Sequence, residues 1–322
     1  MLLMLLNYEE CVILVFLQTV PHMNTIPPVI CYGEILWDLL PTGEVPGGAP
    51  MNVAYHLNKL GHSPAVITRI GKDERGAKLI ALLEGKNIST DFVQTDKLLP
   101  TGIVYATPNE HKEMEYDIVA PVAWDVIEWN DDLPELFNDK NYFVYGSLIA
   151  RNLTSRDTLF RLLEIAKNKV VDINLRPPHY DNALLRDLLT KANIAKLNNE
   201  ELNFISSWFG DYASTEDKMN LLRDKFNLDT VIVTRGGDGA MLNISGKIYS
   251  HPGFKVIVQD TVGSGDSFLA AIISGFIEKR QPSELLEFAS AVGALVTSKK
   301  GGWPEYELSD VKAIINGKVA VS

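Results

Sequence analysis

Short apolar runs alternate with segments of helical periodicity along most of the chain. The runs are rich in β-branched and aromatic residues, which favour strands, and the segments between them repeat apolar positions at helical spacing. The predicted strands are residues 29–32, 65–70, 142–145, 170–173, 193–197 and 230–234. Continuously apolar strands that alternate with amphipathic helices are typical of a mostly parallel sheet covered on both faces. The pattern therefore predicts an α/β fold.

Two segments break this alternation. Residues 101–119 have the pattern of two strands around a polar turn, and residues 35–45 are strand-like with Pro41-Thr42-Gly43 as their turn. Neither segment has a neighbouring helix to cover it, so we expect them to form a small separate sheet over the main one. A sheet with an uncovered face is a candidate lid or a candidate dimer surface.

Residues 1–22 are set apart from the rest of the chain. The stretch up to residue 20 is apolar, but it lacks the basic start and the small-residue cleavage site of a secretory signal. Glu9 and Glu10 interrupt it, which disfavours a membrane span. Met23 offers an alternative start that leads directly into the first strand. We predict an extension without a catalytic role, and an additional surface helix is the other interpretation.

The composition, with 46% hydrophobic and 22% charged residues, excludes a disordered chain, a collagen-like fibre and a bare coiled coil. A net charge of −11 disfavours nucleic acid and anionic membranes as partners. A small anionic ligand stays open, because a local nest of N–H groups can override the overall field. The sequence has two cysteines and no zinc-binding motif, which suits a protein with reduced thiols in the cytoplasm.

The strongest chemical signal lies around residues 260–268. A strand predicted at 254–258 leads into the turn Gly263-Ser264-Gly265, which opens a helix with an apolar face. Glycines at a helix N-terminus let backbone N–H groups converge on an anion, where the helix dipole adds about half a positive charge. Asp266 in the first turn could then accept a proton, as phosphoryl transfer to a hydroxyl requires. A tight turn with an acidic helix start explains these residues equally well.

Other nucleotide-binding motifs are missing from the sequence. No Gly-Lys pair is followed by Ser or Thr, no G-x-G-x-x-G follows the first strand, and the H-R-D and D-F-G motifs of protein kinases are absent. These observations disfavour a P-loop enzyme, a protein kinase and a dinucleotide-dependent oxidoreductase.

Two motifs together resemble a known family. The stretch Asp260-Thr261-Val262-Gly263-Ser264-Gly265-Asp266, and the upstream stretch Gly47-Gly48-Ala49-Pro50-Met51-Asn52-Val53-Ala54 with Gly61 and Gly71, are similar to the signatures of the ribokinase-like (PfkB) sugar kinases, specifically their fructokinase branch. The similarity runs from about residue 30 to residue 304. It implies an α/β/α sandwich of three layers, with a mostly parallel sheet and a small β-sheet lid at about 35–45 and 101–119. Residues 23–322 would form this kinase domain.

The resemblance also implies roles for residues of the acceptor side. Asp266 falls on the family's catalytic base, and Gly263, Ser264 and Gly265 fall on its anion hole. Asp38 falls on an acid near the lid that accepts hydrogen bonds from sugar hydroxyls, with further polar contacts from Gly48 and Asn52. Taken alone, Asp38 could be a solvated turn residue, and the glycine pair a loop before a helix that Pro50 helps to start.

Arg176, in the motif Asp172-Ile173-Asn174-Leu175-Arg176-Pro177-Pro178, matches an arginine that points into the sugar pocket. It is the only positive group that we place there, and its alternative is an exposed arginine at a turn fixed by proline. Asn198 and Glu201 resemble the family's N-x-x-E element, which orders Mg²⁺ through water. Their alternative is a cap on a helix that runs to Trp208, and both could serve both purposes.

On the nucleotide side the resemblance implies weaker assignments. Backbone contacts with ATP would come from the loop after the strand at 230–234, and Ser290 would flank adenine. The loop residues concerned are Thr234, Gly236, Gly237 and Gly239. A glycine turn between two strands, and core packing for Ser290, are the alternatives. Carbonyl groups near Asp260, Val262 and Gly302 fall on a K⁺ site of many relatives.

We therefore expect a sugar kinase that uses ATP and Mg²⁺, with fructokinase as the first candidate. A kinase for a related acceptor such as 2-keto-3-deoxygluconate is the alternative within this class. A non-catalytic binding or scaffold protein is the alternative from another class, although Asp266 and its glycine turn are intact. The lid could form a homodimer, and neither the acceptor sugar nor the oligomeric state is fixed by the sequence.

Overall fold

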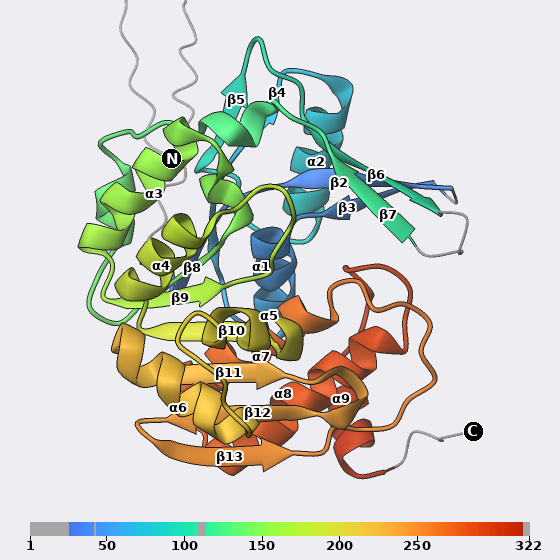
Figure 1. Ribbon diagram of the computed structural model, residues 1–322. Coiled ribbons are helices and arrows are strands. Elements are labelled where there is room, and N and C mark those ends of the chain that lie inside the picture. Colours follow the sequence, from blue (N-terminus) through green and yellow to red (C-terminus); the bar gives the residue numbers. More distant parts are fainter. Residues whose placement is uncertain (1–25, 42, 109–113, 318–322) are drawn as a thin grey trace, which may run out of the picture.

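The computed structural model describes residues 26–41, 43–108 and 114–317. Its centre is a nine-stranded sheet in the order β13-β12-β11-β10-β9-β8-β1-β4-β5 (Figure 1). In this order, neighbouring strands from β11 through β10, β9, β8, β1 and β4 to β5 are parallel. At the other edge, β12 is antiparallel to β11, and β13 is antiparallel to β12. The strands are β1 Val29–Tyr32, β4 Ala65–Gly71, β5 Val93–Asp96, β8 Tyr142–Gly146, β9 Asn168–Asp172, β10 Ile194–Asn198, β11 Thr230–Thr234, β12 Ala240–Ile244 and β13 Lys247–His251. The predicted α/β class and mostly parallel sheet are confirmed.

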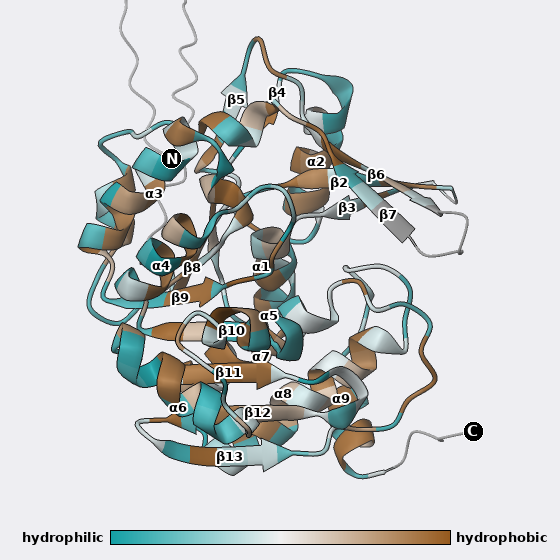
Figure 2. Ribbon diagram, viewed as in Figure 1, coloured by the Kyte–Doolittle hydropathy of each residue, from teal (hydrophilic) through white to brown (hydrophobic). Residues whose placement is uncertain are grey.

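Helices cover both faces of this sheet. They are α1 Ala49–Lys59, α2 Glu74–Gly85, α3 Leu153–Ile165, α4 Asn182–Lys191, α5 Asn199–Ser206, α6 Thr215–Phe226, α7 Ser264–Ile277, α8 Pro282–Thr297 and α9 Leu308–Ile315. The buried core forms two clusters, one under α1, α2, α7, α8 and α9 and the other under α3 to α6. Side chains of β1 alternate between them, with Val29 and Cys31 in the first cluster and Ile30 and Tyr32 in the second. Figure 2 shows mostly hydrophobic residues along β10 and β11, and alternating hydrophilic and hydrophobic bands along α3, α4 and α6.

A second, smaller sheet projects from the main body (Figure 1). It has the strand order β3-β2-β6-β7, with β2 Leu36–Leu40, β3 Gly43–Gly47, β6 Gly102–Pro108 and β7 Met114–Ile118. The strands β2 and β6 are parallel, and the two outer pairs are antiparallel hairpins. The small sheet predicted from 35–45 and 101–119 is therefore present, while Thr42 and residues 109–113 of its turns lie outside the described residues.

The predicted strand at 254–258 is wrong. After β13 the chain has no regular structure until α7 begins at Ser264, and Ile257 and Val258 are about half exposed. The backbone N–H groups of Gln259 and Asp260 instead donate to the carbonyl of Thr297 at the end of α8. The segment crosses from the sheet edge to the start of α7, so no neighbouring strand satisfies its backbone. The helix that begins at Asn199 also ends at Ser206, two residues before the predicted Trp208.

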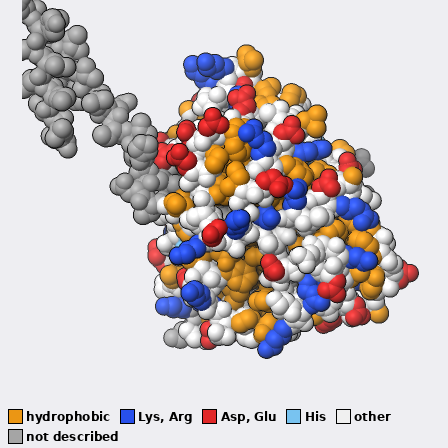
Figure 3. Space-filling view, turned by 90° about the vertical axis from the view of Figure 1, so that its left-hand side faces the viewer, with side chains coloured by type: hydrophobic (Ala, Val, Ile, Leu, Met, Phe, Trp, Pro, Cys, Tyr) orange, Lys and Arg blue, Asp and Glu red, His pale blue; other side chains and the backbone are white. Residues whose placement is uncertain are grey.

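No helix among the described residues is long and apolar enough to span a membrane. The extension predicted at residues 1–22 lies outside the described residues. Figure 3 shows one face of the molecule, on which acidic and basic side chains are interspersed with hydrophobic ones. No continuous basic surface appears on that face.

Candidate active site

A cavity of about 460 Å³ lies where the small sheet faces the carboxyl ends of the central strands. Ligands of open α/β sheets bind at this edge, because the loops that follow the strands converge there. Its wall is formed by the segment from Glu34 to Asp38, by β6 and β7 of the small sheet, by the start of α1, by Leu148 after β8, by the ends of β10 and β11 and the loop after β9, and by the start of α7. Ten of the residues predicted from the sequence lie in its wall: Asp38, Gly48, Asn52, Arg176, Asn198, Thr234, Val262, Gly263, Gly265 and Asp266.

The start of α7 has the form of an anion hole. Gly263 has a φ of 75°, and a Cβ there would lie 2.8 Å from the Cα of Gly302, so this position needs glycine. No side chain in the described part of the chain caps the helix, which leaves first-turn N–H groups available to an anion near Gly265. The side chain of Ser264 faces α8 instead, where the hydroxyl of Thr297 donates to its Oγ over 3.0 Å. Ser264 can therefore serve the anion hole only through its backbone.

Asp266 is half-buried one residue further along α7. The Nδ2 group of Asn52 donates to its Oδ2 over 2.7 Å. Burial raises the pKa of Asp266 to about 6, and the nearby Asp172 carboxylate adds to this shift, while Lys196, Asn52 and Arg176 oppose it. A carboxyl group that titrates near neutrality can take up a proton during the reaction, so the geometry and the pKa both suit a general base.

Lys196 on β10 places a positive charge behind the glycine turn. Its Nζ donates to both carboxylate oxygens of Asp172, over 2.9 and 2.7 Å, and both side chains are buried. A Cβ on Gly265 would lie 3.3 Å from this Nζ, so the absence of a side chain there lets the ammonium group approach the turn. Burial alone would lower the pKa of Lys196, but the carboxylates of Asp172 and Asp266 outweigh it and raise the pKa. The lysine is therefore a charged member of the site.

The sequence analysis assigned no role to Lys196. It placed Arg176 as the only positive group of the pocket, and this is corrected by the structure, since both residues line the cavity. A signal was present, because Lys196 is a lone charged residue inside an otherwise apolar buried strand. Such a residue is rarely buried without a partner.

Two further carboxylates face the cavity from the small-sheet side. Burial raises the pKa of Asp38 to about 6, against the opposing charge of Arg176. Gly47, on the paired strand β3, leaves the room that the Asp38 carboxylate occupies. Glu34 is buried, and its Oε1 accepts the N–H of Ala49 over 3.1 Å, while its Oε2 has no partner among the described residues. Burial raises the pKa of Glu34 to about 7, and the sequence analysis did not select this residue.

Arg176 follows β9 and lines the cavity, as predicted. Its side chain is exposed overall, and its Nη1 donates to the backbone carbonyl of Leu175 over 3.0 Å. The charge of the guanidinium group opposes the rise that burial causes in the pKa values of Asp38 and Asp266. It is therefore placed where it can bind the oxygen atoms of an acceptor.

Asn198 and Glu201 form the helix cap that the sequence analysis gave as their alternative role. The N–H of Glu201 donates to Asn198 Oδ1, and the N–H of Asn198 donates to Glu201 Oε2, both over 2.8 Å. The other oxygen of Glu201 accepts the N–H of Leu175 over 2.8 Å, so this carboxylate also holds the loop that carries Arg176. The Mg²⁺ role of Glu201 stays a prediction, and the residue does not line the cavity.

The remaining predicted residues lie outside the cavity wall. Gly236, Gly237 and Gly239 form the turn between β11 and β12, and Ser290 is buried in α8. The carboxylate of Asp260 accepts the N–H groups of Val262 and Gly301, each over 3.0 Å. The carbonyl of Gly302 is hydrogen bonded to His56 Nε2 over 3.0 Å. The ATP contacts of these glycines and the K⁺ site stay predictions.

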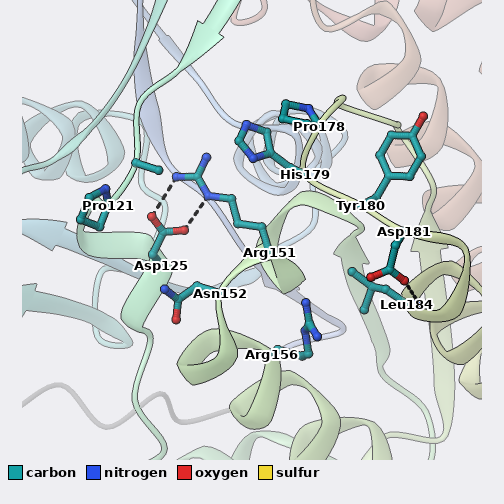
Figure 4. Close-up of a pocket in the computed structure, with 11 residues that line it drawn as sticks. Pro121, Asp125, Arg151, Asn152, Arg156, Pro178, His179, Tyr180, Asp181 and Leu184 are labelled. Carbon is teal, nitrogen blue, oxygen red and sulfur yellow. Dashed lines mark hydrogen bonds and ion pairs between the residues drawn. The ribbon is translucent and has the colours of Figure 1, made fainter.

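A second hollow, of about 490 Å³, shares no lining residue with the first. Figure 4 shows Arg151 and Asp125 pointing toward one another in it. They form two hydrogen bonds of 2.6 and 2.8 Å, and Arg151 also donates to the carbonyl of Val119 and stacks over Trp124. Because these two buried charges neutralise one another, the hollow lacks the combination of anion hole and acid that the first cavity contains. The first cavity is the candidate active site.

An anion hole, a half-buried carboxylate that can accept a proton and a sugar-sized cavity with acidic walls, on an α/β/α sandwich, are typical of phosphotransferases that act on alcohols. The comparison with protein-family models gives the particular family. The model described as "pfkB family carbohydrate kinase" matches residues 39–305. The chain belongs to the pfkB family of carbohydrate kinases and is a sugar kinase.

Individual relatives agree with this assignment. The chain is 30% identical to the probable chloroplastic fructokinase-6 of Arabidopsis thaliana, over 86% of this chain and 79% of the relative. It is 28% identical to a fructokinase of Solanum tuberosum, over 86% and 91% of the two chains. Among solved structures, the fructokinase of Xylella fastidiosa with bound ATP matches with a TM-score of 0.79 and 22% identity, over 91% of this chain and 99% of that one. The fructokinase of Vibrio cholerae O395 with fructose, ADP and calcium matches with a TM-score of 0.77 and 22% identity, over 90% and 99%.

Proposed function

We propose that the protein is a fructokinase, which transfers the γ-phosphoryl group of ATP to the terminal primary hydroxyl of fructose and forms fructose 6-phosphate. The observation that carries this proposal is the Asp266 carboxylate, with its raised pKa, beside the start of α7 in a cavity with acidic walls. The relatives that cover most of the chain are named fructokinases.

In the reaction, Asp266 takes the proton of the acceptor hydroxyl. The hydroxyl oxygen then forms its bond to the γ-phosphorus while the bond from that phosphorus to the bridging oxygen breaks, and ADP leaves. Negative charge that develops on the phosphoryl group faces the N–H groups of the α7 turn, the helix dipole and the ammonium group of Lys196. Asp172 keeps that ammonium group charged and in place.

The polar groups around the acceptor suit a neutral polyol. Asp38 accepts hydrogen bonds, and an ionised carboxylate can receive more than one hydroxyl group. Among the described residues, Arg176 is the one cation of the wall without a carboxylate partner, because Lys196 is already paired with Asp172. A single exposed arginine is a weak anchor for a substrate carboxylate. We therefore favour fructose over 2-keto-3-deoxygluconate, which would need Arg176 for its charge.

The nucleotide and its metal ion belong to the same proposal. Among the described residues, no group of three His, Cys, Asp or Glu side chains could hold a metal ion, and both oxygens of Glu201 already accept backbone N–H groups. The residues thus fit Mg²⁺ only as an ion held by the phosphates of ATP and by water, and not in a protein cage. Bound in this way, Mg²⁺ would offset the charge of the phosphates. We place the nucleotide beside Asn198 and Thr234, at the ends of β10 and β11.

Three further expectations accompany the proposal. The small sheet would close over the acceptor as a lid, since Tyr116 and Val104 of this sheet line the cavity. Its exposed Tyr105 would suit a homodimer contact. The protein would act in the cytoplasm. Residues 1–22 would have no catalytic role, so a chain that starts at Met23 would turn over as fast as the full chain.

A panel of sugars tests the proposed function. The purified chain, with ATP and Mg²⁺, is offered fructose, glucose, ribose and 2-keto-3-deoxygluconate, and ADP formation is followed with product analysis. The expected result is the highest kcat/KM for fructose and a product phosphorylated at the primary hydroxyl. A preference for the keto acid that disappears in Arg176→Ala would replace fructokinase by the alternative acceptor. Binding of sugar and ATP without turnover in any arm would support a scaffold protein instead.

A further inference from the structure

Three side chains of α1 contact one short loop near the candidate base. Asn52, Tyr55 and His56 are spaced by three and four residues, so they share one face of the helix. This face packs against residues 302–306, where the hydroxyl of Tyr55 donates to the carbonyl of Pro304 over 2.8 Å, and the Tyr55 ring stacks on Trp303 with centroids 5.1 Å apart. The contact holds the indole ring in a fixed position beside Asn52.

The amide group of Asn52 connects this loop with the base. The indole Nε1 of Trp303 donates to Asn52 Oδ1 over 2.7 Å, and Asn52 Nδ2 donates to Asp266 Oδ2 over 2.7 Å. An indole N–H is a donor only, so the atom that faces it must be the amide oxygen. The other end of the amide, which faces Asp266, is then the NH₂ group. Trp303 therefore determines the orientation of the amide and the direction of its hydrogen bond.

The direction of this hydrogen bond affects the ionisation and the orientation of the Asp266 carboxylate. An N–H that donates to Oδ2 favours the ionised carboxylate and restrains its rotation, which leaves Oδ1 for the acceptor hydroxyl. A flipped amide would turn its oxygen toward Asp266 and repel the ionised form. Gly302 and Gly263 allow the close packing, because a Cβ on Gly302 would lie 3.3 Å from Asn52 Oδ1, and one on Gly263 would lie 2.8 Å from the Cα of Gly302.

From this geometry we propose that Asn52 is a positioning residue for the catalytic base, and that Trp303 acts through Asn52 by setting its amide orientation. Asn52 then acts on Asp266 rather than as a direct sugar ligand, the role that the family resemblance implies. The proposal rests on the assignment of Asp266 as the base and deepens the proposed function, but it does not depend on which sugar is the acceptor.

Other charged groups also face Asp266 and stay in place in every variant of the test. They are Asp172 and Lys196 from the central sheet, Arg176 from the loop after β9, and Glu34 and Asp38 from the small-sheet side. Because these groups are constant, a change in the titration of Asp266 in variants of Asn52 or Trp303 reports on the hydrogen-bond chain alone.

The first arm of the test measures kcat against pH in the wild type, Asn52→Ala and Trp303→Phe, with whichever sugar of the panel is phosphorylated. Loss of a hydrogen bond to a charged group should move the acid limb of Asn52→Ala upward by about one to two pH units. Trp303→Phe retains the stack on Tyr55 and removes only the N–H, so its limb should move in the same direction by less. Sugar KM should stay unchanged in both.

Trp129→Phe is the matched control. It also removes an indole N–H, one that donates to Asp131 Oδ1 over 3.2 Å, but neither residue lines the active-site cavity. Its acid limb should coincide with that of the wild type. Asn52→Asp provides an opposite change, since it places a second carboxylate against Asp266 and should move the limb further upward than Asn52→Ala.

A second arm does not require turnover. The carboxyl carbon of Asp266 is followed by NMR in protein labelled at the aspartate carboxyl groups, and is assigned by its absence in Asp266→Asn. The expected pKa rises in the order wild type, Trp303→Phe, Asn52→Ala. An unchanged pKa and acid limb, with a raised sugar KM in Asn52→Ala, would overturn the proposal and return Asn52 to the role of sugar ligand. Failure of fructose in the panel would contradict only the proposed acceptor.

Discussion

One buried ion pair lies at the second hollow and another at the active-site cavity, and the two pairs differ in what surrounds the cation. In the second hollow the planar guanidinium group of Arg151 uses its donors on Asp125 and on the carbonyl of Val119, and its face lies on Trp124. In the active-site cavity the ammonium group of Lys196 is held by Asp172 but lies against the side-chain-free turn at Gly265. Both ion pairs are thus buried. They differ because a ligand can approach the cation of the pair in the active-site cavity.

The largest expected effect on stability comes from breaking the structural pair. Arg151→Met leaves the Asp125 carboxylate buried without its partner, which should lower the free energy of unfolding by about 3–5 kcal/mol. Turnover of the protein that remains folded should not change. Denaturant unfolding combined with kcat measurement checks this, and a fall in kcat at unchanged stability would show that the two pairs do not differ as we infer.

Breaking the active-site pair should affect catalysis as well. Lys196→Met removes the ammonium group beside the anion hole, and we expect kcat to fall by about 10²–10³, comparable to the loss of one oxyanion-hole donor. The double variant Lys196→Met/Asp172→Asn removes the unpaired carboxylate too. It should regain stability without regaining kcat. Recovery of turnover in the double variant would mean that Lys196 serves only to neutralise Asp172.

A smaller effect concerns the cost of burying the base. Burial raises the pKa of Asp266 in the folded protein to about 6, above its ordinary value of 3.8. The protonated group therefore makes its full contribution to stability below pH 3.8, and this contribution is lost as the pH rises through 6. Asp266→Asn removes this cost and should stabilise the protein by on the order of 2 kcal/mol at pH 8. The gain should vanish near pH 4 in thermal unfolding, whereas a gain independent of pH would have another origin.

The smallest expected effect concerns the acceptor side. Asp38→Asn keeps one acceptor oxygen but loses the negative charge, so the KM for fructose should rise about tenfold, in line with the difference between charged and neutral hydrogen bonds. The KM for ATP should not change. Steady-state kinetics with each substrate varied in turn separates the two constants. An equal rise for both substrates would place Asp38 outside the acceptor pocket.

Local patterns predicted the elements well where one apolar run forms one strand. The run at 230–234 became β11 with the same bounds, because its first four residues are buried and it pairs with β10 on one side and β12 on the other. The run at 254–258 has a similar composition but has no partner strand, and it stays irregular. Pairing partners lie far away in the sequence, which explains why a strand-like pattern alone was not sufficient there.

The sequence predicted those site residues that belong to a recognisable motif. The glycine turn, Asp266, Asp38 and Arg176 line one cavity as expected, because each belongs to a motif with a local conformation. Lys196, Glu34 and Trp303 were not found, since each acquires its role from a contact with a distant element. Trp303 meets Asn52 across 251 positions of the sequence, and no local pattern could have indicated that hydrogen bond.

The central claim is that Asp266 takes the proton of the acceptor hydroxyl, and Asp266→Asn tests it most directly. Asn retains the size of the side chain and an oxygen that can accept the hydrogen bond from Asn52, but it cannot act as a base. The measurement is kcat for fructose phosphorylation, together with calorimetric binding of fructose and of ATP. We predict a fall in kcat of about 10²–10⁴ with both binding affinities nearly unchanged. Turnover at the wild-type rate would contradict the account.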